Sequence, residues 1–386
     1  MEEAAQIHSD HLLAEPTEEI LENSSRVFVE SGLEPDDEFQ GLAYRPQISS
    51  RLQWLDALRG FTMILVVAYH VAQMAFGENE KTSCSLPFLV LFRMPLFFFV
   101  SGFLAYKVSF QWNLSSIGHQ LWKKFLVQVI PTLVFLSIFI ILRKGDFWAN
   151  FTHILSLPTK SGYWFTWVLL QMFVIYYAIG RHSWAIWAMW LVSIGVYATL
   201  YMPKIFTYHK ADFFQVSSLV LTMKFMQFFL LGNLVHRYWD RVQRIFAAPW
   251  FYPTVTVLAF FCCADIFRWH TFKFMWTNLP RTLAMYSLLM MVVTFFHYYQ
   301  GWLARETCMG RTLQYVGTRT LDIYLIHFIV MPKLTFVGKW LNANQPNFLI
   351  DIMCSLIVAV PVIVLCCLIS HILRVSPFFK KYLFGR

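Results

Sequence analysis

The chain has 386 residues, of which 58% are hydrophobic, 18% aromatic and only 14% charged. Soluble domains usually carry about 25% charged residues, so this composition excludes a water-soluble globular protein and predicts a chain that lies mostly in lipid. The formal net charge of +9 is not gathered in one basic patch, and we therefore expect no nucleic-acid partner.

Charge divides the chain near residue 50. Residues 1–50 hold 12 acidic and two basic side chains, whereas the remainder holds 29 basic and ten acidic ones. An acidic, aromatic-poor segment before an apolar, basic body predicts a disordered cytoplasmic arm over 1–50 and a membrane domain over 51–375. A short basic cytoplasmic tail is expected over 376–386.

The predicted fold is all-α, a polytopic bundle of about ten transmembrane helices. Ten apolar runs are long enough for this, near 53–76, 86–106, 120–142, 163–180, 184–202, 213–235, 250–267, 282–299, 313–335 and 350–373. An even number of spans places both termini on one side. Connecting segments that would then be cytoplasmic carry 15 Lys and Arg residues against 11 on the other side, which favours an N-in/C-in orientation.

The first span contains three ionisable residues, Asp56, Arg59 and His70. Such groups are costly inside a membrane and mark function by default. At about 100° per residue, Arg59 and His70 lie on one helix face and are separated by about 16 Å along the axis, with Asp56 near the same face. Asp56 and Arg59 could also be only an ion pair that eases insertion.

Later spans add further polar groups. Arg93 in the second span is expected at the same membrane depth as His70, because the two helices run in opposite directions. The ninth span supplies Asp322, Tyr324 and His327, and the sixth supplies Lys224 and Gln227. Each of these groups taken alone could be an interhelical hydrogen-bonding partner.

Several segments together resemble one protein family. LDALRGFTMILVVAYH with its Arg59 and His70, RMPLFFFVSGFL, YWFTWVLLQMFVIYY, FLLGNL and LDIYLIHFIV are similar to the acyltransferase-3 family of integral membrane acyltransferases. The resemblance runs from about residue 51 to 375. It implies a multi-pass enzyme of a bacterial cytoplasmic (inner) membrane that moves an acyl group, usually acetyl from cytoplasmic acetyl-CoA, onto a cell-surface or periplasmic glycan.

The residues suit the chemistry that this resemblance implies. A sugar hydroxyl needs a general base, for which His70 is the candidate, and the thioester oxyanion needs a donor, for which Arg93 is the candidate. Asp56 and Arg59 would orient the donor or the helix, and His327 would have a secondary role. An acyl-histidine intermediate is an open alternative.

Acyl-CoA is the expected donor substrate, and no metal is expected, because no His and Cys residues show metal-ligand spacing. The phosphates of the coenzyme need a basic opening on the cytoplasmic side of the protein. The candidate residues are Arg59, Lys123, Lys124 and Arg319. A transporter or flippase that uses the same polar stripe as a conduction path is the alternative function, and the absence of an evident inverted repeat weakens it. A non-catalytic scaffold would not explain the alignment of Arg59 with His70.

Overall fold

A computed structural model of the chain describes residues 52–80, 82–143, 145–200, 216–263, 278–303, 307–344 and 348–377, with single positions 213, 379 and 383. The chain divides into two units, Met1–Arg51 and Leu52–Arg386. The expected acidic arm over 1–50 and most of the expected basic tail lie outside the described residues.

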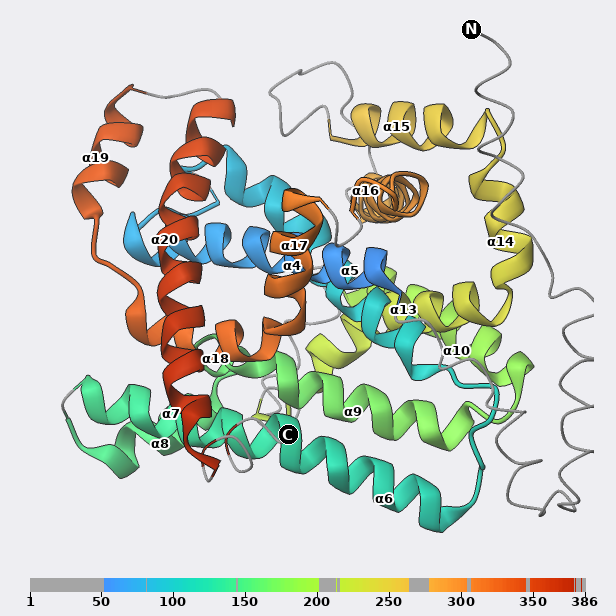
Figure 1. Ribbon diagram of the computed structural model, residues 1–386, viewed down its shortest axis with the longest axis horizontal. Coiled ribbons are helices and arrows are strands. Elements are labelled where there is room, and N and C mark those ends of the chain that lie inside the picture. Colours follow the sequence, from blue (N-terminus) through green and yellow to red (C-terminus); the bar gives the residue numbers. More distant parts are fainter. Residues whose placement is uncertain are drawn as a thin grey trace, which may run out of the picture. The chain divides into compact units, whose positions relative to one another are not determined.

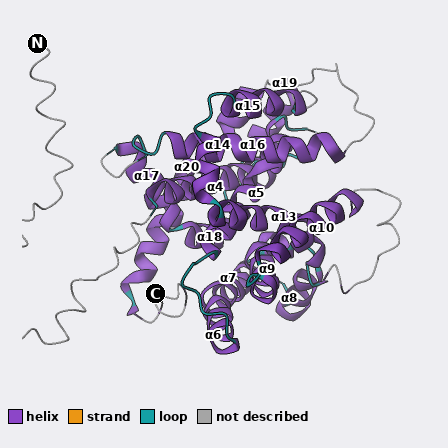
Figure 2. Ribbon diagram, turned by 90° about the vertical axis from the view of Figure 1, so that its right-hand side faces the viewer, coloured by secondary structure: helices purple, strands orange, loops and turns teal. Residues whose placement is uncertain are grey.

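The described part of the second unit consists of helices and their connections, without a strand, which confirms the all-α prediction (Figures 1 and 2). The helices are α4 (Gln53–His70), α5 (Ser85–Ala105), α6 (Leu114–Lys124), α7 (Ile130–Leu142), α8 (Phe147–Ser156), α9 (Trp164–Ile179), α10 (Ser183–Leu200), α13 (Leu219–Arg237), α14 (Trp239–Phe246), α15 (Phe251–Cys262), α16 (Asn278–Tyr298), α17 (Cys308–Thr318), α18 (Thr320–Val330), α19 (Thr335–Asn344) and α20 (Phe348–Val375). Two π-helical turns, η1 (Val71–Ala75) and η2 (Phe125–Val129), continue α4 and α6, and a 3₁₀ turn, η3 (Lys160–Gly162), precedes α9.

Five helical stretches among the described residues are long and apolar enough to cross a membrane, or up to seven if two sharply bent helix pairs each count as one span. The bent pairs are α14 with α15, at 78°, and α18 with α19, at 89°. The predicted spans near 163–180 and 184–202 correspond to the shorter apolar helices α9 and α10. The chain is thus a multi-pass membrane protein, while ten spans and the N-in/C-in orientation stay predictions.

Helix α4 lies at the centre of the bundle and packs on α5, α17, α18 and α20. Helices α6, α7, α8 and α9 form a layer beside this centre, at the bottom of Figures 1 and 2. The space between the centre and this layer holds the cavity described below.

Two helix crossings at the centre depend on glycine. A Cβ atom on Gly60 of α4 would overlap the carbonyl of Leu313 in α17, and one on Gly317 would overlap the carbonyl of Asp56. The backbones of α4 and α17 are therefore in direct contact, as expected for helices that associate in lipid through small residues. Gly102 of α5 and Gly232 of α13 make a second crossing of the same kind.

The end of α4 is joined to the bend between α18 and α19. The amide of Leu334, in the bend, donates a hydrogen bond to the carbonyl of Ala75 at the end of η1, with N···O 2.9 Å. Gly338 of α19 lies so close to Phe76 that an added Cβ would overlap the Phe76 carbonyl. A π turn leaves helical backbone groups without their usual partners, and the bend supplies one.

Candidate active site

A cavity of about 320 Å³ lies between α4, α5, α6, α9 and α18. From α4 it is lined by Arg59, Met63, Val66 and His70, which recur at helical spacing and form one stripe. The sequence prediction that Arg59 and His70 share a helix face is confirmed. The two residues lie about 16 Å apart along the axis, so the cavity is elongated along α4.

The two ends of the cavity differ in character. Near the start of α4, the lining residues include the cations Arg59, Lys124 and Arg374, beside the end of α5 at Ala105. Around the end of α4, the lining includes His70 and Arg93, which the sequence placed at one depth. A basic region and an imidazole–guanidinium pair thus occupy opposite ends of one continuous cavity.

His70 lies against His327, with the ring centroids 5.2 Å apart. His327 is fully buried, and its Nδ1 lies 2.9 Å from the Ile323 carbonyl oxygen. A carbonyl only accepts, so Nδ1 carries a proton, and Nε2 has no hydrogen-bond partner among the described residues. His327 itself is not among the residues that line the cavity, but its ring contacts those of His70 and Tyr324, which are.

Arg93 projects into the same end of the cavity. Its guanidinium carbon lies 3.5 Å from the centroid of the Tyr69 ring, and 8% of the residue is exposed. The aromatic face holds the cation in place without neutralising it, because the interaction is with the ring quadrupole. Its Nε has no hydrogen-bond partner among the described residues.

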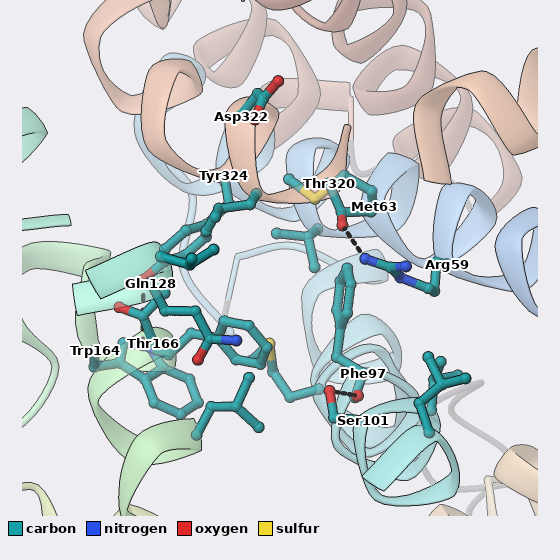
Figure 3. A pocket seen from close by; sticks show the side chains of 18 of the residues that line it. Arg59, Met63, Phe97, Ser101, Gln128, Trp164, Thr166, Thr320, Asp322 and Tyr324 are labelled. Atoms are coloured by element: carbon teal, nitrogen blue, oxygen red, sulfur yellow. Dashed lines mark hydrogen bonds between the residues drawn. The ribbon is translucent and has the colours of Figure 1, made fainter. Parts of the chain in front are cut away.

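Arg59 belongs to the basic end of the cavity. Its Nη2 donates to Thr320 Oγ1 at 3.0 Å (Figure 3). Its Nη1 lies 3.6 Å from Asp56 Oδ1. Asp56 is 6% exposed and is not part of the cavity lining, so it is placed to orient Arg59 rather than to contact a ligand.

Asp322 lines the cavity, but its carboxylate points away from the other labelled side chains (Figure 3). Ser370 Oγ and the guanidinium of Arg374 donate to it from α20, with Arg374 Nη2 2.7 Å from Oδ2. The carboxylate is thus held in an ion pair and leaves the remaining cavity surface positive.

Of the remaining predicted basic residues, only Lys124 lines the cavity. Its ammonium lies 3.4 Å from the centroid of the Phe173 ring. Lys123 is exposed and Arg319 packs on the Tyr315 ring, and neither is among the residues that line this cavity. Lys224 and Gln227 of α13 also lie outside its lining.

The wall opposite α4 begins at the turn η3. Lys160 and Ser161 have positive φ angles of 44° and 51°, and Gly162, which lines the cavity, has a φ of 101°. Lys160 is 6% exposed, and its ammonium donates to the carbonyls of Leu155 and Val216 at 2.9 and 2.8 Å. Burial lowers the pKa of Lys160, and these carbonyl contacts hold the strained turn in place.

Tyr324 ties this wall to α18. Its hydroxyl donates to the Gly162 carbonyl at 2.9 Å and accepts from the Phe165 amide at 3.2 Å. Sequence reasoning recognised Tyr324 only as a neighbour of His327 on its helix. The pairing with a distant turn has no signal in the sequence.

Sequence reasoning missed Gln128, Trp164 and Thr166, which line the cavity from η2 and α9 (Figure 3). Gln128 carried a recognisable signal, because an amide side chain within an apolar span needs a hydrogen-bonding partner. Trp164 looked like an interfacial anchor.

A protein-family model matches most of the chain. The model of the acyltransferase-3 family, described as an acyltransferase domain, matches residues 52–371, which include every cavity-lining residue up to the end of α18. No curated protein and no solved structure matches the chain.

Proposed function

We propose, from the premise that the chain belongs to the acyltransferase-3 family, that this membrane acyltransferase moves an acetyl group from acetyl-CoA to a hydroxyl of a cell-surface or periplasmic glycan. The family supports acyl transfer in a membrane, and the donor and acceptor are our proposal. One observation carries it: a single cavity joins a basic region at Arg59, Lys124 and Arg374 to His70 and Arg93 about 16 Å deeper.

A cavity with cations at one end and an imidazole at the other suits an acyl-CoA. The phosphates of the coenzyme would bind the cations, and the acyl end of its narrow arm would reach the imidazole. With the predicted N-in orientation, which the positive-inside pattern favours, the basic end would face the cytoplasm, where acyl-CoA is available. Only Lys124 and Arg59 of the four predicted coenzyme-binding residues line the cavity, and Arg374 joins them in the proposed site.

At the deep end, His70 would accept the proton of the acceptor hydroxyl while the hydroxyl oxygen attacks the thioester carbonyl. The guanidinium of Arg93 would donate to the oxyanion that forms. When the carbon–sulfur bond breaks, the sulfur leaves as a thiolate and takes the proton from His70. In a route through acyl-His70, the imidazole would first attack the thioester and release the thiolate, and the acceptor hydroxyl would then take the acyl group and return the imidazole.

The test replaces His70 by Ala and measures glycan acetylation by mass spectrometry of surface glycans from cells with and without the gene. General acid–base groups contribute about 10²–10⁴-fold to rates, so acetylation should fall to the background of cells without the gene. His119→Ala is the matched control, because His119 is exposed on α6 and does not line the cavity. Undiminished acetylation by an expressed His70→Ala protein would refute the assignment.

A further inference from the structure

Gln128 is the one cavity-lining group, among the described residues, that has an unpartnered buried oxygen on an uncharged side chain. Its Oε1 has no hydrogen-bond partner among the described residues. A buried amide oxygen without a partner costs free energy comparable to a lost hydrogen bond. The position therefore calls for a ligand group that donates.

A π-helical turn places this side chain. Gln128 lies in η2, which separates α6 from α7. Its carbonyl accepts from Thr132 Oγ1 at 2.7 Å, and Thr132 is bonded in turn to Thr166 Oγ1 of α9 at 2.9 Å. Turns of this kind are frequent at functional sites, and here α9 holds the turn so that the amide faces the cavity.

The amide lies between the two ends of the cavity. It follows Lys124 by four residues on the same helical stretch, and Figure 3 shows it across the cavity from Arg59. His70 lies about 16 Å farther along α4 than Arg59. A ligand that joins the cations to His70 would therefore run along the cavity wall that Gln128 helps to form.

A side-chain amide offers one acceptor and two donors in a plane, which matches another amide group. The pantetheine arm of an acyl-CoA is uncharged and contains two amides between its phosphates and its sulfur. We propose that Gln128 binds an amide of this arm and so fixes how far the thioester reaches toward His70. This inference rests on the proposed acyl-CoA donor and names a positioning residue for it.

The experiment measures the affinity of the purified full chain for CoA and for adenosine 3′,5′-bisphosphate, which has the nucleotide end without the arm. Gln128→Met keeps the side-chain length and removes the amide. It should weaken CoA binding about tenfold and leave the affinity for the bisphosphate unchanged. Gln111→Met, at an exposed position in the loop before α6, is the control and should match the wild type.

Gln128→Asn keeps a shortened amide and serves as the second variant if Gln128→Met does not fold. Its loss of CoA affinity should be smaller than tenfold, again without an effect on the bisphosphate. Unchanged CoA binding by the variants, or an equal loss for both ligands, would overturn the role of Gln128 and leave the proposed function standing. A wild-type chain that binds neither ligand would instead refute the acyl-CoA donor.

Discussion

The guanidinium of Arg374 binds the carboxylate of Asp322 through two nitrogens, with Nε 3.1 Å and Nη2 2.7 Å from Oδ2. The pair joins the end of α20 to the start of α18 at the basic end of the cavity. Asp322 is 3% exposed, and Ser370 completes its hydrogen bonds. The pair therefore neutralises the only carboxylate among the described residues that line the cavity.

Replacing Asp322 by Asn should destabilise the protein by about 3 kcal/mol, because removal of one partner leaves a buried charge uncompensated. The measurement is the midpoint of thermal unfolding in detergent. The double variant Asp322→Asn, Arg374→Met should recover part of the loss, since no unpaired charge is left. A double variant as unstable as the sum of the two single variants would show that the pair has no mutual coupling.

His327 should act through His70 and not on the donor, because it does not line the cavity. His327→Phe keeps the ring volume and removes both nitrogens. We expect kcat to fall about 10- to 100-fold with an unchanged KM for acetyl-CoA, as for a misplaced catalytic group. A raised KM with unchanged kcat would show instead that His327 contacts the donor.

Gly60→Ala should prevent folding or destabilise the protein by about 3 kcal/mol or more, because the new methyl group would overlap the Leu313 carbonyl. Gly195→Ala in α10 is the matched control. An added Cβ there meets nothing within 4 Å, so the change should be neutral or stabilising. Yield and unfolding temperature after purification measure both effects, and equal behaviour of the two variants would contradict the packing argument.

Glu78, in the loop between α4 and α5, should make stability depend on pH. It is 4% exposed, and burial, with the nearby charge of Asp351, raises its pKa from 4.5 to about 7. The folded chain therefore holds a proton that the unfolded chain releases at lower pH, so this group costs stability as pH rises from 4.5 to 7.

Glu78→Gln removes this titration. The variant should gain stability relative to the wild type as pH rises across that window, and the difference should level off above pH 7. Unfolding midpoints of both proteins from pH 4 to 8 measure it. A difference that is constant with pH would show that Glu78 has the same pKa in the folded and the unfolded chain, which would contradict this prediction.

The parts of the site that lie on one helix were predictable from the sequence. Helical periodicity alone predicted that Arg59 and His70 lie on one face of α4. The opposite directions of α4 and α5 predicted that His70 and Arg93 lie at the same depth. The membrane character followed from composition. These features depend only on local geometry and on the cost of placing charge in lipid.

What could not be predicted depends on tertiary packing. The choice between Lys123 and Lys124 is set by which face of α6 meets α9, and two adjacent lysines carry no such information. The pairing of Asp322 with Arg374 joins residues 52 positions apart. The π turns and the sharp bends within the apolar runs likewise come from contacts between helices, so uniform spans were expected where the structure has breaks.

The joint between η1 and the α18–α19 bend has a mechanical consequence. His70 immediately precedes η1, and His327 lies one turn before the bend, so both imidazoles are attached to the same hydrogen-bonded junction at Ala75 and Leu334. The junction therefore fixes the relative position of the two helix ends that carry these rings, whose centroids lie 5.2 Å apart. Arg93, on α5, is tied to the same group through the ring of Tyr69, which adjoins His70 on α4.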